Sequence, residues 1–126
     1  MARILIAEDE EPVRTLVARA PAEEGHSVLA TADGTEALDA LQSEDGAFDL
    51  LLADIKMPGM DGIALALAVA RDFPRLPILL MTGFADQRDR AFGLEALICD
   101  VIAKPFALAD IKVAAASALA KGKRRP

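Results

Sequence analysis

The chain contains few of the residues from which disulfides, aromatic binding surfaces or membrane anchors are built. Its 126 residues include one cysteine, one histidine, and no tryptophan or tyrosine. A single cysteine cannot form a disulfide within the chain, which fits a reducing compartment. No apolar run approaches the length of a membrane span, and the run between Arg3 and Glu8 is too short for a secretory signal. We therefore expect a cytoplasmic protein without membrane contact.

Acidic residues outnumber basic residues, 20 to 14. The net charge is −6, and binding to the nucleic-acid backbone requires a basic face that displaces counterions. We therefore expect no nucleic-acid partner. The one basic cluster consists of Lys121, Lys123, Arg124 and Arg125. We expect residues 121–126 to form a disordered, solvated tail after a single domain over residues 1–120.

Short apolar runs alternate with stretches of helical period, which predicts successive β–α units. Most of the runs are apolar on both faces, as in parallel strands that helices cover from both sides. The expected fold is α/β, a doubly wound five-stranded parallel sheet of order 2-1-3-4-5 with five helices, as in flavodoxin. The expected strands are Arg3–Ala7, Ser27–Ala30, Phe48–Ala53, Pro77–Met81 and Asp100–Ala103.

The helical stretches have one irregular position. Apolar residues recur at helical spacing between Val13 and Ala20, and a fourth helix is expected at about 86–97. Pro21 falls inside the first helix, before Gly25 ends it. An interior proline removes a hydrogen bond and clashes with the preceding turn, so we expect a kink or an early end there.

Polar side chains stand where four of the expected strands stop. They are Glu8, Asp9, Asp54, Thr82 and Lys104. The carboxyl ends of parallel strands lie at one edge of the sheet, so these groups should converge. Three carboxylates that close together repel one another unless a cation offsets their charge. Oxygen ligands that leave room for water and phosphate oxygens favour Mg²⁺.

The hydroxyl and the ammonium indicate a second ligand. A metal alone does not need Thr82 and Lys104, whereas phosphoryl oxygens require donors and positive charge. With Asp54 as the attacking carboxylate, the product is an aspartyl phosphate. His26, the only histidine, is expected at the opposite end of the strands, so the phosphoryl donor must be another molecule.

These motifs resemble the receiver domain of bacterial two-component response regulators over residues 3–120. The pattern is an acidic pair after the first strand, Asp54 followed by MPGMDG, Thr82 followed by a small residue, and a Lys104–Pro105–Phe106 step. The resemblance implies that Asp54 is the phosphoacceptor.

The resemblance also implies the remaining roles at the site. Asp9, Asp54 and the backbone carbonyl of Lys56 would hold Mg²⁺, and Glu8 would act mostly through water. Thr82 would be the switch hydroxyl, and Lys104, whose bond to Pro105 is typically cis in this family, would pair with the phosphate.

The implied partners follow from the same resemblance. A histidine kinase or histidine phosphotransfer protein would supply the phosphoryl group. A downstream protein would bind the face formed by the fourth helix, the fifth strand and the fifth helix, and the protein would be a monomer or weak dimer. The chain is most similar to CpdR-type single-domain regulators, which implies an adaptor for an ATP-dependent protease.

Two positions depart from the family pattern. Val101 stands where the family usually has an inward-turning aromatic residue. Phe84 is bulky and lies close to the expected site, and with Lys56 it is expected to slow attack of water on the phosphoaspartate, unless both merely cover surface.

Two other functions fit parts of the pattern. A haloacid-dehalogenase-type phosphohydrolase also uses an Asp nucleophile, but it needs a general acid two residues later, where this chain has Lys56. A receiver-like scaffold that is never phosphorylated would have no use for the full polar set. A receiver is not an enzyme in the ordinary sense, although it can catalyse its own phosphorylation and dephosphorylation.

Overall fold

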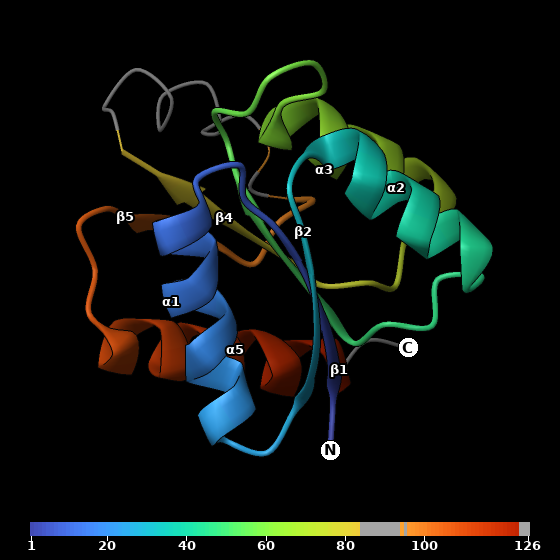
Figure 1. The fold of residues 1–126 in the computed structure, drawn as a ribbon. Helices are drawn as coiled ribbons and strands as arrows, with labels where there is room; N and C mark the ends of the chain where they lie inside the picture. Colours follow the sequence, from blue (N-terminus) through green and yellow to red (C-terminus); the bar gives the residue numbers. More distant parts are fainter. Residues whose placement is uncertain (84–93, 95, 124–126) are drawn as a thin grey trace.

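A computed structural model of the protein has five parallel strands with helices on both sides of the sheet (Figure 1). The structure describes residues 1–83, 94 and 96–123. The strand order β2-β1-β3-β4-β5 confirms the doubly wound, flavodoxin-like sheet. The strands are β1 (Arg3–Ala7), β2 (Ser27–Thr31), β3 (Leu50–Asp54), β4 (Ile78–Thr82) and β5 (Asp100–Ala103), and the described helices are α1 (Glu11–Glu23), α2 (Gly34–Ser43), α3 (Gly62–Asp72) and α5 (Leu108–Lys123).

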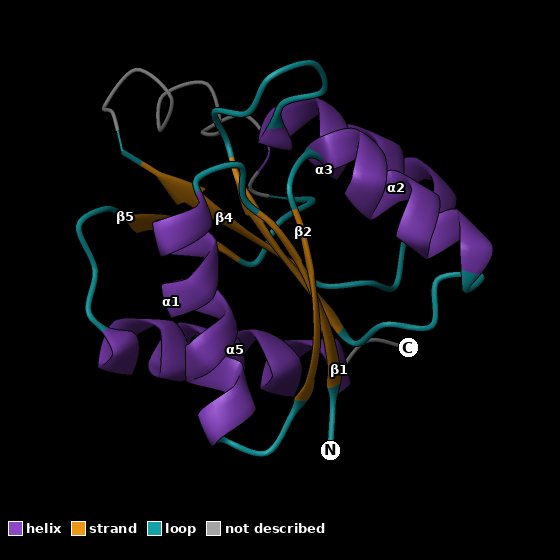
Figure 2. Ribbon diagram, in the orientation of Figure 1, coloured by secondary structure: helices purple, strands orange, loops and turns teal. Residues whose placement is uncertain are grey.

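Two apolar layers enclose the sheet. Helices α1 and α5 lie on one side, and α2 and α3 lie on the other (Figure 2). In β1, Ile4 and Ile6 pack into the α1/α5 layer, whereas Leu5 and Ala7 pack into the α2/α3 layer. Burial on both faces explains why the strands read as continuous apolar runs.

Local signals in the sequence begin the helices. The side chains of Asp33 and Asp61 accept hydrogen bonds of 2.8 Å from the backbone N–H of Glu36 and Ala64, respectively. These bonds cap α2 and α3. Pro12 lies in the first turn of α1, where its missing N–H costs little. None of the helices in the described part of the chain is long and apolar enough to cross a membrane.

Helix α1 continues past Pro21 to Glu23, so the early end, one of the two outcomes expected at Pro21, does not occur. The last turn is closed by Gly25, whose φ of 87° is in the left-handed region. The N–H of Gly25 donates to Ala22 O and that of His26 to Pro21 O, both at 3.1 Å. This Schellman pattern satisfies the terminal carbonyls, including that of Pro21 itself, so the helix ends at the glycine.

The expected domain boundary at residue 120 falls within a helix at the end of the chain. Helix α5 extends to Lys123, and Gly122 lies so close to Pro77 that a Cβ there would be 2.6 Å from Pro77 Cγ. This contact places the first residues of the expected tail against the domain. Residues 124–126, Phe84 and most of the expected fourth helix lie outside the described residues.

The turn from β3 into α3 requires two glycines for different reasons. Gly59 has a φ of 70°, which a side chain disfavours. A Cβ at Gly62 would overlap the carbonyl oxygen of Asp54 and lie 2.8 Å from Ile55 Cα. The N–H of Gly62 also donates to Ile55 O at 2.8 Å. Helix α3 therefore begins in direct contact with the backbone of Asp54.

We expect Gly62→Ala to lower the free energy of unfolding by about 3 kcal/mol or more, because backbone atoms cannot move aside as a flexible side chain can. Gly83→Ala is the matched control. A Cβ there has ordinary contact with Lys104 Cδ at 3.8 Å, so its effect should stay within about 0.5 kcal/mol. Urea unfolding measures the free energy of unfolding of both variants. Equal losses would show that the close packing at Gly62 does not cause the instability.

Candidate functional site

The register of the sheet brings the polar strand ends together. Ala7 pairs with Ala53, so the next residues, Glu8 and Asp54, lie at the same level. Further along the sheet, Asp54 pairs with Met81, the residue before Thr82. Thr82 in turn pairs with Ala103, the residue before Lys104. The structure thus gathers the side chains that the sequence placed at strand ends.

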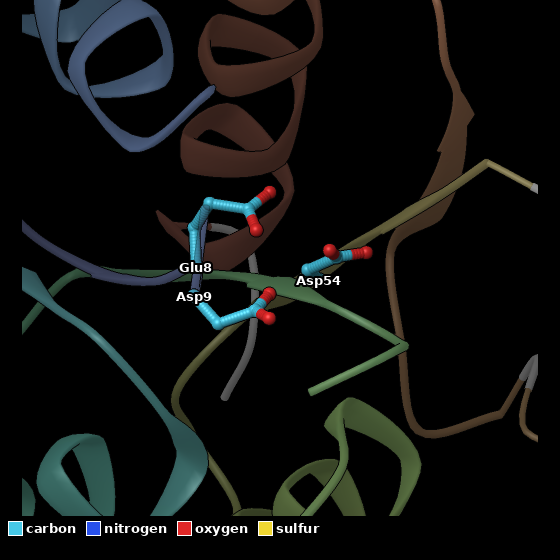
Figure 3. A group of neighbouring side chains, drawn as sticks. All are labelled: Glu8, Asp9 and Asp54. Carbon is cyan, nitrogen blue, oxygen red and sulfur yellow. The ribbon is translucent and has the colours of Figure 1, made fainter. Parts of the chain in front are cut away.

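Three carboxylates form the acidic part of this site. Oxygen atoms of Glu8, Asp9 and Asp54 lie within 4.8 Å of one another. Figure 3 shows Glu8 and Asp9 at the end of β1 reaching to the side where Asp54 stands at the end of β3. Glu8 is fully buried and Asp54 is 3% exposed, whereas Asp9 is exposed. Asp9 is therefore the acid most open to solvent.

Lys104 joins the two buried acids. Its Nζ lies 2.9 Å from Asp54 Oδ2 and 3.0 Å from Glu8 Oε1. Burial by itself lowers the pKa of Lys104, but the hydrogen bonds to Asp54 and Glu8 outweigh it and raise the pKa above its usual value. The side chain is therefore a permanent cation next to Asp54. The peptide bond from Lys104 to Pro105 is cis, as the resemblance implies.

Glu8 is held at each of its polar atoms. Its N–H donates to Thr31 O at 3.1 Å, and its Oε2 accepts from the N–H of Glu10 at 3.2 Å. Burial, and next the charge of Asp54, raise the pKa of Glu8 from 4.5 to about 7 against the opposing effect of Lys104. Both carboxylate oxygens of Glu8 already accept hydrogen bonds from the protein. This is consistent with the expectation that Glu8 contacts a metal through water and not directly.

A pocket of about 550 Å³ opens over these groups. Its wall includes Asp9, Asp54 and Lys104, together with Lys56 from the loop after β3. Lys56 is exposed, and its carbonyl as a metal ligand stays a prediction. A larger cavity of about 740 Å³ is lined in part by His26, Phe48 and Phe73, and its lining includes none of the predicted site residues.

Thr82 lies at the back of the site. It is 2% exposed, and its carbonyl accepts a hydrogen bond of 2.7 Å from the backbone N–H of Lys104. The hydroxyl residue and the lysine are therefore linked directly through the backbone. A displacement of the Thr82 backbone would therefore act on the end of β5.

Two contacts at the site were missed by sequence reasoning. Arg14 Nη1 donates to the carbonyl of Glu8 at 2.9 Å, and Thr31 supplies the carbonyl that accepts from the Glu8 N–H. Both involve backbone atoms, which leave no motif in a sequence. His26 directly precedes β2, and its Nδ1 accepts a hydrogen bond of 3.1 Å from the Ala2 N–H. It therefore lies at the amino ends of β1 and β2, opposite the carboxyl ends that carry the acidic residues, as expected.

The donor set fits Mg²⁺. Its side-chain ligands are carboxylate oxygens, and among the described residues no thiol or imidazole belongs to the cluster. Mg²⁺ in proteins usually keeps several water ligands and also binds phosphate oxygens, and the pocket leaves room for both. A cation would also offset the charge of Asp54, which after burial is the second cause of the raised pKa of Glu8.

Comparison with known sequences gives a family match over most of the chain. The family model for the response regulator receiver domain matches residues 4–116. The chain is 37% identical over 109 residues to the transcriptional regulatory protein TcrA of Mycobacterium tuberculosis and 36% identical over 109 residues to the response regulator MprA of Mycobacterium avium. These matches cover 86% of the chain but 42% and 47% of the two proteins. The chain thus spans about half the length of these curated relatives, and neither is a CpdR-type regulator, so that finer resemblance is not supported.

Solved structures match the fold. A receiver domain protein from Clostridium thermocellum has a TM-score of 0.88 at 22% identity, and a CheY-like receiver from Methanospirillum hungatei has 0.88 at 27%, each covering 98% of both chains. The regulator TrrA from Thermotoga maritima, in complex with Mg²⁺ and BeF, has a TM-score of 0.81 at 29% identity and covers 92% of this chain and 97% of its own.

We expect the metal-free protein to lose stability as the pH rises. The pKa of Glu8 is about 7 in the folded state against 4.5 ordinarily, so the folded state binds more protons and is favoured below this window. The free energy of unfolding should fall by up to about 3 kcal/mol as the pH rises through it. Urea unfolding in EDTA measures this change, and Glu8→Gln should flatten the profile. A wild-type profile that already matches Glu8→Gln would contradict the shift.

Proposed function

The chain belongs to the response regulator receiver domain family, and from this premise we propose that it is a phosphoryl-accepting switch with Asp54 as the acceptor. The observation that carries the proposal is the placement of a nearly buried Asp54 beside two further carboxylates and within 2.9 Å of the Lys104 ammonium. The donor is the phosphohistidine of a histidine kinase or of a histidine phosphotransfer protein.

The transfer forms one bond and breaks one bond. A carboxylate oxygen of Asp54 bonds to the phosphorus as the phosphorus–nitrogen bond of the donor breaks, and the bonding pair stays on the imidazole nitrogen, which then takes up a proton. Asp9 and Asp54, with the carbonyl of Lys56, are proposed to hold Mg²⁺, and Glu8 supports the site through water. Bound Mg²⁺ supplies positive charge against the phosphoryl oxygens.

Phosphorylation changes the partners of Lys104. Formation of the acyl phosphate removes the negative charge of the Asp54 carboxylate, and the phosphoryl oxygens become stronger acceptors for the ammonium. The hydroxyl of Thr82 is proposed to donate to the same oxygens. Since the Thr82 carbonyl accepts from the Lys104 N–H, both shifts act on the end of β5.

The output of the switch is proposed to be protein binding at the face that includes β5 and α5. Residues 121–123 continue α5, and residues 1–120 are proposed as the receiver unit, a monomer or weak dimer in the cytoplasm. The absence of a nucleic-acid partner stays a prediction from the net charge of −6, because TcrA is a transcriptional regulatory protein and the chain matches 42% of it. A protease-adaptor role is left as one outcome of a binding experiment.

We expect acetyl phosphate with Mg²⁺ to add one phosphoryl group to the wild type and none to Asp54→Asn, because the amide is a poor nucleophile. Intact-mass spectrometry measures the label, and peptide mapping locates it. EDTA should abolish labelling. A wild type that takes no label would contradict the proposal and support the receiver-like scaffold. Sustained turnover of a small phosphate ester would instead support the phosphohydrolase.

We expect Thr82→Ala to accept the phosphoryl group without passing the change to β5. NMR amide shifts of Val101 and Ile102 on phosphorylation should be large in the wild type and reduced several-fold in Thr82→Ala. Thr82→Ser keeps the hydroxyl and serves as the control, and its shifts should resemble those of the wild type. Equal shifts in all three proteins would remove Thr82 from the switch.

A further inference from the structure

We propose that Arg14 is a positioning residue for the metal site, which it serves by fixing the peptide unit between Glu8 and Asp9 from helix α1. The inference rests on the proposed function, because it concerns the binding of Mg²⁺ between the acidic residues. Arg14 itself is not proposed to touch the metal or the phosphoryl group.

The contact is made to the backbone of the acidic pair. Arg14 Nη1 donates to the carbonyl oxygen of Glu8 at 2.9 Å, and this bond is partly buried. That oxygen belongs to the peptide group whose nitrogen is the amide of Asp9. Holding the oxygen therefore holds the plane of the peptide, which sets the direction in which the Asp9 side chain leaves the backbone.

Arg14 is itself anchored to the segment that it holds. It lies in the first turn of α1, and its backbone N–H donates to Glu10 O at 2.8 Å. The chain from Glu8 to Arg14 is thus closed into a loop by its own hydrogen bonds. A closed loop has fewer conformations to lose when a ligand binds, which is the physical advantage of preorganisation.

Asp9 depends on this arrangement more than the other two acids do. Glu8 is fixed by Lys104 and by the N–H of Glu10, and Asp54 is the last residue of β3. Asp9 follows the end of β1, is exposed, and lines the pocket. The geometry of its backbone therefore decides where its carboxylate stands.

The charge of Arg14 and its hydrogen bond act on Mg²⁺ in opposite directions. A guanidinium near the site repels a divalent cation, so removing it should tighten Mg²⁺ binding if charge alone matters. Losing the hydrogen bond should weaken Mg²⁺ binding, because groups that orient metal ligands commonly account for tenfold or more of the affinity. The sign of the change separates the two effects.

The test is calorimetric titration of Mg²⁺ into the wild type, Arg14→Met and Arg14→Lys. Arg14→Met keeps the apolar stem and removes the donors, and its dissociation constant should rise about tenfold. Arg14→Lys restores a charged donor and should recover most of the affinity. Arg19→Met is the control, since it removes the same charge from α1 at an exposed residue that pairs with Glu23.

Each outcome has a separate meaning. Binding by Arg14→Met that equals or exceeds that of the wild type overturns the inference, and so does an equal loss in Arg19→Met. A wild type that binds no Mg²⁺ contradicts the proposed function instead. Urea unfolding is measured for every variant, and if Arg14→Met does not fold, Arg14→Leu, which also lacks a donor, replaces it. The inference is supported when affinity falls in Arg14→Met, returns in Arg14→Lys, and does not follow the free energy of unfolding.

Discussion

The ion-pair contact of Lys104 with Glu8 and Asp54 is the interaction on which the rest of the site depends. Two carboxylates removed from water destabilise the fold unless a positive charge accompanies them. Lys104 supplies that charge at 2.9 and 3.0 Å, yet the pKa of Glu8 is still raised to about 7. Burial is the larger cause of that shift and the charge of Asp54 the second, so one ammonium does not fully offset two buried carboxylates, and a cation would lower their mutual repulsion. The affinity for a metal and the cost of burial have the same electrostatic origin.

The sheet determines where this interaction occurs. Parallel pairing brings residues from distant parts of the sequence to one edge, and the register sets which residue of each strand arrives there. The two apolar layers restrict that register, because each layer packs closely around its own set of side chains from alternate positions of the strands. The polar groups thus owe their geometry to apolar side chains that never touch a ligand. Stability of the layers and function of the site are coupled through the strands.

The sequence predicted the sheet order and the residues at the strand ends because both follow from patterns of side chains. It placed Asp54 and Thr82 just after their strands, whereas they are the last residues of β3 and β4, because ladder hydrogen bonds use the backbone whatever the side chain. From the sequence we expected a kink or an early end of the helix at Pro21. Helix α1 instead continues to Glu23, and hydrogen bonds to the Pro21 carbonyl close its last turn. Arg14 was missed for the same reason, since its partner is a carbonyl. The features that the sequence did not predict are those set by hydrogen bonds of the main chain.

The close approach of Gly62 to the carbonyl of Asp54 has a mechanical consequence. With no gap between them, the start of α3 and the main chain of Asp54 cannot slide past each other, and the hydrogen bond from the Gly62 N–H to Ile55 O holds them together. A movement of α3 along its axis would therefore displace the backbone of Asp54 as well. A side chain at residue 62 would separate the two, so their direct coupling depends on glycine at this position.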